Sequence, residues 1–579
     1  MRLTDSARAV WARTRSLTPP AWLGPFGREP WIVLGPLILV QWLALIVFMV
    51  TVRHNSWLYY QGGDQTFYWT TGWSFAHWRL PTAEVGWGWS YLLSPLAGIM
   101  GNTVLSGLPG IILVDTLVLL PVALLGMYGI GSRIAGRVFG YWTAGLWIAL
   151  PYIAIPLFVQ RYHGKFIEQT LPQTFGLTPL ADFPSMVLLI VAAYLVVRAL
   201  DTRDWREAVL AGLVVGFAFC VKPSNVIFFP APLVAFLIAR RWRQVLYFGA
   251  AMVPGLLLVV LWKQRGLGTQ PLFAAGTDGT LASLAVPLAF GVLAGGIGRY
   301  VHINWQHLQE NKDSLREFFW AVRPLQWVAL AGVIGLLRRS WAKGALVAIW
   351  FYAFLVVKGT SEQARVEDAS FFRLLMPSYP AFVLLIAGVP LLVPQLGRRL
   401  TERYPPGKAN PSRLTRPIIV VAVLLVALPA VVLGATRVQT SPRTVRNDAQ
   451  HTLVPVTDSL HLDGTARNGA VQLTWKRPYS GPVGVFYVVL RSPKKFPDPT
   501  NPDERTVTEG VSCREQRSGA AKDCHLFMRR IRATRGFTFV DHPPKGSWSY
   551  RIGLAANWLN DPTRGDVLLV SEPFTLDVG

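Results

Sequence analysis

The chain has 579 residues, of which 52% are hydrophobic and only 15% charged, and its formal net charge is +24. About a quarter of the residues of a soluble protein are charged, so this composition argues against a soluble protein and favours a multi-span membrane protein. Most arginines lie in short segments between apolar runs and not on one polar face, which argues against a nucleic-acid-binding protein.

Residues 1–30 are basic and contain four prolines. They lack a small-residue cleavage site after a short apolar core, so we interpret 31–52 as an uncleaved first span and not as a signal peptide. From there to residue 436, apolar runs predict about eleven membrane helices. The runs are 31–52, 103–127, 138–159, 183–199, 207–221, 225–239, 245–262, 324–337, 342–357, 375–395 and 417–435. We interpret a Gly-rich apolar stretch at 281–297 as a re-entrant or interfacial segment, and a full span there would change this count.

Arginine and lysine gather in alternate short loops, and cytoplasmic loops carry the excess of such cations. The cation-rich segments are 2–15, 133–137, 198–206, 240–243, 338–343 and 398–416. The outer side then holds the loops 53–102, 160–182, 263–323 and 358–374, together with everything after residue 436. We therefore expect a multi-pass protein of the cell membrane with a cytoplasmic N-terminus.

The first and third outer loops are rich in aromatic residues. The tryptophans of the first loop suit helices that lie in the lipid headgroup layer. They are Trp57, Trp69, Trp73, Trp78, Trp87 and Trp89. In the third loop, residues 307–320 predict a further surface helix.

The first outer loop contains an acidic motif, Tyr-Tyr-Gln-Gly-Gly-Asp, that ends at Asp64. A carboxylate at the mouth of a membrane bundle can act as a general base and remove a proton from an acceptor hydroxyl. The alternative is a turn residue that caps an interfacial helix. The position of Asp64 just past the first span favours the general base.

The second outer loop supplies Arg161, His163, Lys165 and Glu168 as candidate substrate ligands, followed by Asp182 at the head of the fourth span. Asp182 is either a helix N-cap or a second carboxylate that binds a metal ion or orients an acceptor.

Two further cations lie at the outer membrane boundary, where isolated charges are costly. Lys222 ends the fifth span and Arg373 precedes the tenth. They are candidates for stabilising a phosphate leaving group, and the alternative is snorkelling to the interface. Asp115 lies inside the second run without an evident partner, so we leave it outside the predicted site. No Walker-type loop, dinucleotide fingerprint or zinc-ligand spacing is present, so the sequence shows no nucleotide cofactor.

After residue 436 the long apolar runs end and strand-like alternation begins. Residues 470–475, 485–490, 548–554 and 571–576 predict strands. Their order resembles a fibronectin type III sandwich over about 455–579, within an outer all-β domain at 437–579. Cys513 and Cys524 lie there, in a compartment that permits disulfides, and are either bridged or free.

Residues 30–435 resemble the GT-C superfamily of integral-membrane glycosyltransferases, in the branch of protein O-mannosyltransferases, the aminoarabinose transferase of lipid A and mycobacterial arabinofuranosyltransferases. The matching motifs are Asp64 after Gly62-Gly63, Asp182 before Pro184, Lys222-Pro223, and Arg373 to Pro380. Many relatives have an acidic pair at the first motif, whereas Gln65 follows Asp64 here. A divalent cation such as Mg²⁺ or Mn²⁺ stays open as a cofactor.

The resemblance implies an inverting transfer of a sugar from a polyprenyl-phosphate donor to an extracytoplasmic glycan, lipid or protein. Asp64 would take the acceptor proton, Asp182 would be a second catalytic carboxylate, and Lys222 and Arg373 would hold the departing phosphate. A transporter or flippase of lipid-linked sugars is the main alternative, but it should show an internal repeat, and none is found. The outer β domain either binds the acceptor or serves as a cover.

Overall fold

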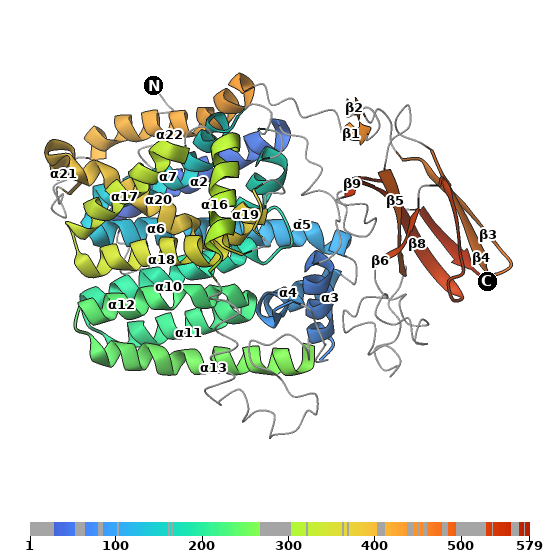
Figure 1. The fold of residues 1–579 in the computed structure, drawn as a ribbon, viewed down its shortest axis with the longest axis horizontal. Helices are drawn as coiled ribbons and strands as arrows, with labels where there is room; N and C mark the ends of the chain where they lie inside the picture. The colour runs from blue at the N-terminus through green and yellow to red at the C-terminus, as the bar shows by residue number, and fades with distance from the viewer. Residues whose placement is uncertain are drawn as a thin grey trace, which may run out of the picture.

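In a computed structural model of the chain, the described residues form a helical part up to Thr436 and a strand-rich part from Thr444. They are 28–51, 64–78, 85–100, 104–159, 163, 166–266, 303–319, 322–361, 364–366, 370–401, 411–436, 444–447, 452–455, 460–476, 485–493, 529–534, 536–556, 567–571 and 574–579. Figure 1 shows most of the long helices side by side in one bundle, with the strands beyond one of its ends.

The helical part follows the apolar runs of the sequence. Its first half contains α2 (Arg28–Thr51), α3 (Asp64–Ala76), α4 (Trp87–Met100), α5 (Val104–Val114), the π-helical turn η2 (Asp115–Leu119), α6 (Leu120–Ala135), α7 (Arg137–Ala154), η3 (Ile155–Leu157), η5 (Phe166–Thr170), α9 (Leu171–Thr174) and α10 (Asp182–Thr202). Its second half contains α11 (Trp205–Val221), η6 (Pro223–Phe228), α12 (Pro230–Ile238), α13 (Trp242–Gly266), α16 (Trp305–Phe318), α17 (Val322–Leu337), α18 (Trp341–Gly359), α19 (Ser370–Leu375), η8 (Met376–Ser378), α20 (Tyr379–Gly388), η9 (Val389–Leu392), α21 (Pro394–Thr401) and α22 (Pro411–Ala435).

Each of the eleven predicted runs falls on a helix, so the polytopic helical class is confirmed. Among the described residues, seven helical segments are long and apolar enough to cross a membrane, and three shorter ones are apolar. These ten segments account for all of the predicted runs except 207–221, which falls on α11. It packs closely on α13, because a Cβ added at Gly255 would lie 2.2 Å from the backbone of Gly216. Small residues of this kind let two membrane helices approach backbone to backbone.

The helices α3 and α4 form a hairpin at the end of the bundle that faces the strands (Figure 1). Its core consists of tryptophans: Trp69, Trp73 and Trp89 are fully buried, and Trp87 is buried against the main core. These four side chains therefore pack against protein and not against lipid, and the position of the two helices in the headgroup layer stays a prediction. Only Trp78, among the predicted tryptophans that the structure describes, is exposed. Trp57 lies outside the described residues.

Ion pairs connect the helices at the opposite end of the bundle. Asp201 accepts from Arg133 at 3.3 Å and from Lys343 at 2.6 Å, which joins α6, α10 and α18. Arg198 also pairs with Glu207 across the α10–α11 turn. Three of the predicted cytoplasmic segments thus meet at one end, while Asp182 begins α10 at the other. The orientation of these ends in a membrane stays a prediction.

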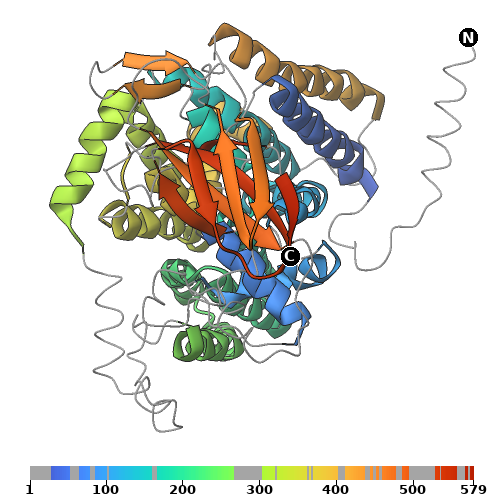
Figure 2. The same ribbon diagram turned by 90° about the vertical axis from the view of Figure 1, so that its right-hand side faces the viewer.

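The strand-rich part has two antiparallel sheets that share one core. One sheet has the order β3 (Leu462–Arg467), β4 (Ala470–Trp475), β7 (Thr538–Asp541), and the other has the order β10 (Phe574–Val578), β8 (Gly546–Ala556), β5 (Val485–Pro493), β6 (Arg529–Thr534), with β9 (Val567–Val570) also paired to β8. A separate hairpin is formed by β1 (Thr444–Asn447) and β2 (Thr452–Pro455). Figure 2 shows the sheets in front of the end of the helical bundle. The fibronectin type III resemblance stays a prediction, and Cys513 and Cys524 lie outside the described residues.

A buried ion pair joins the two sheets. Arg491 of β5 donates to Asp541 of β7 at 2.5 Å, and the hydroxyl of Tyr550 donates to the same carboxylate at 2.6 Å. Burial and this hydrogen bond raise the pKa of Tyr550. The Arg491 guanidinium also lies 5.1 Å from the centre of the Trp548 ring. This cluster satisfies the charges that the core of the two sheets encloses.

Candidate active site

The first two charged residues of the site are brought together by the antiparallel pair α10 and α11. Asp182 is the first residue of α10, and Lys222 directly follows α11, 40 residues later in the chain. The ammonium group of Lys222 donates a hydrogen bond to Oδ1 of Asp182. Ala181, and not Asp182, is the N-cap of α10, so the capping alternative for Asp182 does not describe its position.

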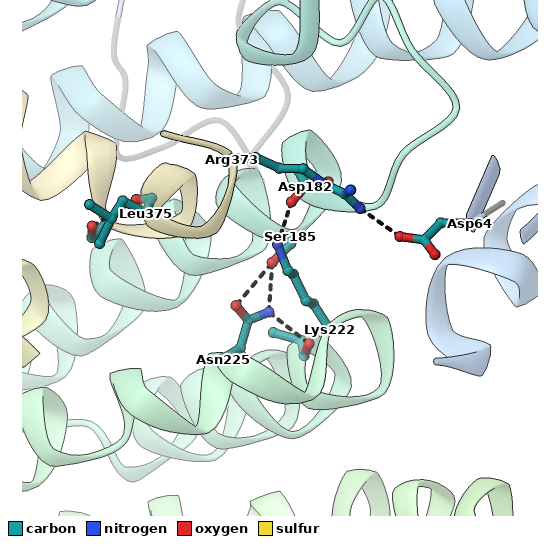
Figure 3. Close-up of polar contacts among 9 residues, drawn as sticks. Asp64, Asp182, Ser185, Lys222, Asn225, Arg373 and Leu375 are labelled. Atoms are coloured by element: carbon teal, nitrogen blue, oxygen red, sulfur yellow. Dashed lines mark hydrogen bonds and ion pairs between the residues drawn. The ribbon is translucent and has the colours of Figure 1, made fainter. Parts of the chain in front are cut away.

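Arg373 connects this pair to Asp64. It lies in the short helix α19, where Nε donates to Oδ2 of Asp182 at 3.0 Å and Nη2 donates to Oδ2 of Asp64 at 2.6 Å. Asp64 is the first residue of α3. Figure 3 shows the Arg373 side chain extending between the two carboxylates. We call Asp64, Asp182, Lys222 and Arg373 the charged quartet. Two carboxylates and two cations alternate along it.

The members of the quartet differ in how far they are open to solvent. The exposed fraction of the side chain falls from 48% for Asp64 and 35% for Arg373 to 15% for Lys222 and 2% for Asp182. Both oxygens of Asp182 are engaged by cations, whereas one oxygen of Asp64 contacts Arg373. Asp64 is therefore the carboxylate that an incoming molecule can reach, and Asp182 holds the two cations in place.

Sequence reasoning did not include Tyr68 in the site. This residue lies four positions after Asp64 on the same face of α3 and is buried. Burial, together with the charges of Asp64 and Asp182, raises the pKa of Tyr68, and the charge of Arg373 opposes this shift. The phenol is therefore kept neutral beside the quartet. The spacing of four residues from Asp64 was the only sequence signal for it.

Lys358 also lies near the site without having been predicted. It is in the last turn of α18, and its ammonium group is within electrostatic reach of Lys222. Lys358 thus adds a further positive charge in the neighbourhood of Lys222.

The other predicted site residues are not brought to the quartet. His163 is buried, with Nε2 at 2.7 Å from the backbone oxygen of Phe158, and makes no hydrogen bond to the quartet in the part that the structure describes. Glu168 lies in η5, but its side chain is not described, and Arg161 and Lys165 lie outside the described residues. Asp115 is fully buried in η2, and neither of its carboxylate oxygens has a hydrogen-bond partner among the described residues.

The carboxylates of the quartet do not suit a divalent cation in this arrangement. A guanidinium lies between Asp64 and Asp182, and Lys222 takes the remaining oxygen of Asp182. Among the described residues, no group of three His, Cys, Asp or Glu side chains is placed to hold a metal ion. Hard divalent cations need several free oxygen ligands. In the described residues, negative charge can therefore be bound by the cationic side chains of the quartet and not by a metal ion.

Residues 166–262, which include Asp182 and Lys222, match the family model described as dolichyl-phosphate-mannose-protein mannosyltransferase. No curated protein sequence matches the chain. The match spans part of the helical fold, from η5 to α13, and shows a similarity of this segment to a family of membrane glycosyltransferases.

Solved structures of an archaeal oligosaccharyltransferase from Archaeoglobus fulgidus align with part of this chain. The structure of AglB in complex with an inhibitory peptide and a dolichol-phosphate aligns at a TM-score of 0.40 with 15% identity, covering 70% of this chain and 56% of that one. The apo form aligns at 0.35 with 14% identity, covering 70% and 57%. This chain thus spans a little over half of the length of those proteins. At these scores and identities, the likeness identifies neither a substrate nor a partner.

Proposed function

We propose that the chain transfers a sugar from a polyprenyl-phosphate donor to an acceptor hydroxyl on the outer side of the membrane. The acceptor is a glycan or lipid of the cell envelope, or a protein. The observation that carries this proposal is the charged quartet, in which the half-exposed carboxylate of Asp64 lies beside cations at the end of a bundle of apolar helices. A base and an anion-binding group side by side are what transfer from a phosphate leaving group requires.

The reaction forms one bond and breaks one. The acceptor oxygen bonds to the anomeric carbon of the sugar, and its proton passes to Asp64. The bond from that carbon to the phosphate oxygen breaks, and its electron pair stays on the phosphate. The lipid phosphate therefore gains one negative charge, which Arg373 and Lys222 stabilise. Because the acceptor attacks opposite the leaving group, the anomeric configuration is inverted.

Arg373 also explains how the base becomes available. A carboxylate paired with a guanidinium is a weaker proton acceptor than a free one. The donor phosphate binds the same guanidinium and so competes with Asp64 for Arg373. We infer that the donor binds first, takes over Arg373 and releases Asp64 to meet the acceptor. Asp182, which is closed to solvent, keeps Arg373 and Lys222 directed at the phosphate throughout.

The proposal is tested by measuring sugar transfer in membranes from a panel of polyprenyl-phosphate sugars. We expect transfer by the wild type and a loss of about 10²-fold or more in Asp64→Asn, since general bases contribute factors of this order. Asp313→Asn, which alters an exposed carboxylate on α16, is the matched control and should transfer normally. Equal transfer by wild type and Asp64→Asn would remove Asp64 from the mechanism. Binding of a lipid-linked sugar without transfer from any donor would favour a transporter instead.

A further inference from the structure

We propose that Ser185 and Asn225 form a positioning pair, which holds Asp182 and Lys222 at the separation that phosphate binding requires. The inference rests on the proposed function, because it assigns a role to residues beneath the same site. The side-chain hydrogen bonds described for the two residues are to each other and to the carbonyl of Ala218, and not to the side chains of the quartet. The two residues act on the backbone segments from which Asp182 and Lys222 extend.

The pair repeats the pairing of the charged residues one layer deeper in the bundle. Ser185 follows Asp182 by three positions, and Asn225 follows Lys222 by three positions. Both side chains are fully buried. The Ser185 hydroxyl donates to Oδ1 of Asn225 at 2.9 Å and accepts from Nδ2 at 2.7 Å (Figure 3). The two segments that present the charges are therefore bonded to each other directly.

Asn225 also fixes the backbone of Lys222. Nδ2 of Asn225 donates to the carbonyl oxygen of Ala218 at 2.8 Å, and the same oxygen accepts the amide hydrogen of Lys222 at 2.9 Å. The backbone amide of Asn225 in turn donates to the backbone carbonyl of Lys222 at 2.9 Å. Lys222 is in an extended conformation between α11 and η6, and the proline after it has no amide hydrogen. The Asn225 side chain thus ties down a chain segment that a helix no longer holds.

Burying polar groups is costly unless all of them are bonded, and an apolar pair would fill the same volume without that cost. A satisfied polar pair instead specifies one register between two helices. The opposite end of α10 and α11 is already fastened by Arg198 and Glu207. Ser185 and Asn225 fasten the end that carries the site, where an error of about 1 Å in position is enough to impair a reaction.

The test measures the binding of polyprenyl phosphate, without a sugar, to the full-length protein in lipid nanodiscs. Thermal unfolding is recorded for every variant. We expect Asn225→Ala, Ser185→Ala and Lys222→Met each to raise the Kd by about tenfold, as the loss of one well-placed contact does. Ser185→Thr keeps the hydroxyl and should restore binding. Ser224→Ala is the matched control, because the neighbouring hydroxyl of Ser224 is buried without a hydrogen-bond partner among the described residues.

The decisive comparison uses the double variant Asn225→Ala with Lys222→Met. If Asn225 acts by placing Lys222, the double variant binds polyprenyl phosphate no more weakly than Lys222→Met alone, although its unfolding temperature is lower. If instead the rise in Kd of the double variant is the product of the rises in the two single variants, the proposal is overturned and Asn225 has a purely structural role. If Asn225→Ala does not fold, Ser185→Ala in the Lys222→Met background gives the same comparison with the loss of a single oxygen.

The failure of the inference differs from the failure of the proposed function. A Kd that rises in Lys222→Met but not in Asn225→Ala or Ser185→Ala overturns the positioning pair and keeps the phosphate site. A wild-type protein that does not bind polyprenyl phosphate overturns the proposed function, and the positioning pair with it.

Discussion

Arg373 has two carboxylate partners, and only one of them is replaceable by a substrate. Its contact with the buried Asp182 is shielded from solvent on the carboxylate side, whereas Asp64 is half exposed. An exposed ion pair contributes little to stability and exchanges partners readily. Under the proposed function, the contact between Arg373 and Asp64 is therefore the one that we expect a lipid phosphate to displace.

This competition predicts an effect of Asp64→Asn that a simple loss of the base would not produce. The amide does not hold Arg373 as a carboxylate does, so the variant should bind polyprenyl phosphate more tightly than the wild type, by about tenfold. The measurement is the Kd in nanodiscs at constant ionic strength, with Asp313→Asn as the control. Unchanged or weaker binding would show that Asp64 and the phosphate do not share Arg373.

Tyr68 gives a prediction about pH. Its pKa is raised above the ordinary value of 10.0 by burial and by the two carboxylates, so the phenol stays protonated at any pH below about 10. We expect Tyr68→Phe to lower transfer by about tenfold, the usual effect of losing one hydrogen-bond donor. The factor should be constant from pH 6 to pH 9, because the phenol does not titrate there. The test is to measure initial transfer rates of the wild type and Tyr68→Phe across this pH range. A ratio of the two rates that varies with pH would contradict a phenol that stays protonated.

Among the structural elements, the α3–α4 hairpin determines where Asp64 lies. It is seated directly on the end of α11, since a Cβ added at Gly88 would lie 2.5 Å from the backbone nitrogen of Val221. The indole of Trp89 also donates to the carbonyl of Pro179 at 3.0 Å, shortly before Asp182. The hairpin therefore places Asp64 against the segments that carry Lys222 and Asp182.

Gly88→Ala should displace this hairpin. Overpacking of this kind costs about 1–3 kcal/mol, and the shift moves Asp64 away from Arg373, so transfer should fall by at least about tenfold. Gly145→Ala is the control, because a Cβ at Gly145 on α7 meets no atom within 4 Å. Transfer rates and unfolding temperatures of both variants are compared in the same membranes. Normal transfer by Gly88→Ala would mean that the hairpin does not position the base.

The sequence predicted the helices and the quartet for different reasons. Apolar length marks a helix locally, which is why all eleven runs fall on helices. Asp182, Lys222 and Arg373 were selected because each lies at the end of an apolar run, and Asp64 because it ends an acidic motif in the first outer loop. The structure brings the four together. That Arg373 bonds to both Asp64 and Asp182 was not predictable, since Asp64 and Arg373 are 309 residues apart in the chain. The burial of Trp69 and Trp73 was also missed, because an aromatic amphipathic face looks the same whether it covers protein or lipid.

At the scale of the whole molecule, the two ends of the bundle should lie on opposite sides of the membrane. Trp78 is exposed just after α3, in the hairpin that carries Asp64, and Trp205 is exposed at the turn between α10 and α11. In a background in which the three native cysteines are replaced by serine, Trp78→Cys should react with an impermeant maleimide added to intact cells. Trp205→Cys should react only after the membrane is opened. The reverse pattern would place the site in the cytoplasm and overturn the proposed acceptor side.

The distances along the chain between the members of the quartet have a consequence for biosynthesis. Asp182 and Lys222 are joined by a helical hairpin and can meet as soon as both have been inserted, whereas Arg373 is translated 191 residues after Asp182. Until then, Asp64 and Asp182 have no guanidinium between them, and of the three ion pairs of the quartet only that between Lys222 and Asp182 can form. Under the proposed function, we therefore expect a nascent chain to become active only after α19 has been made.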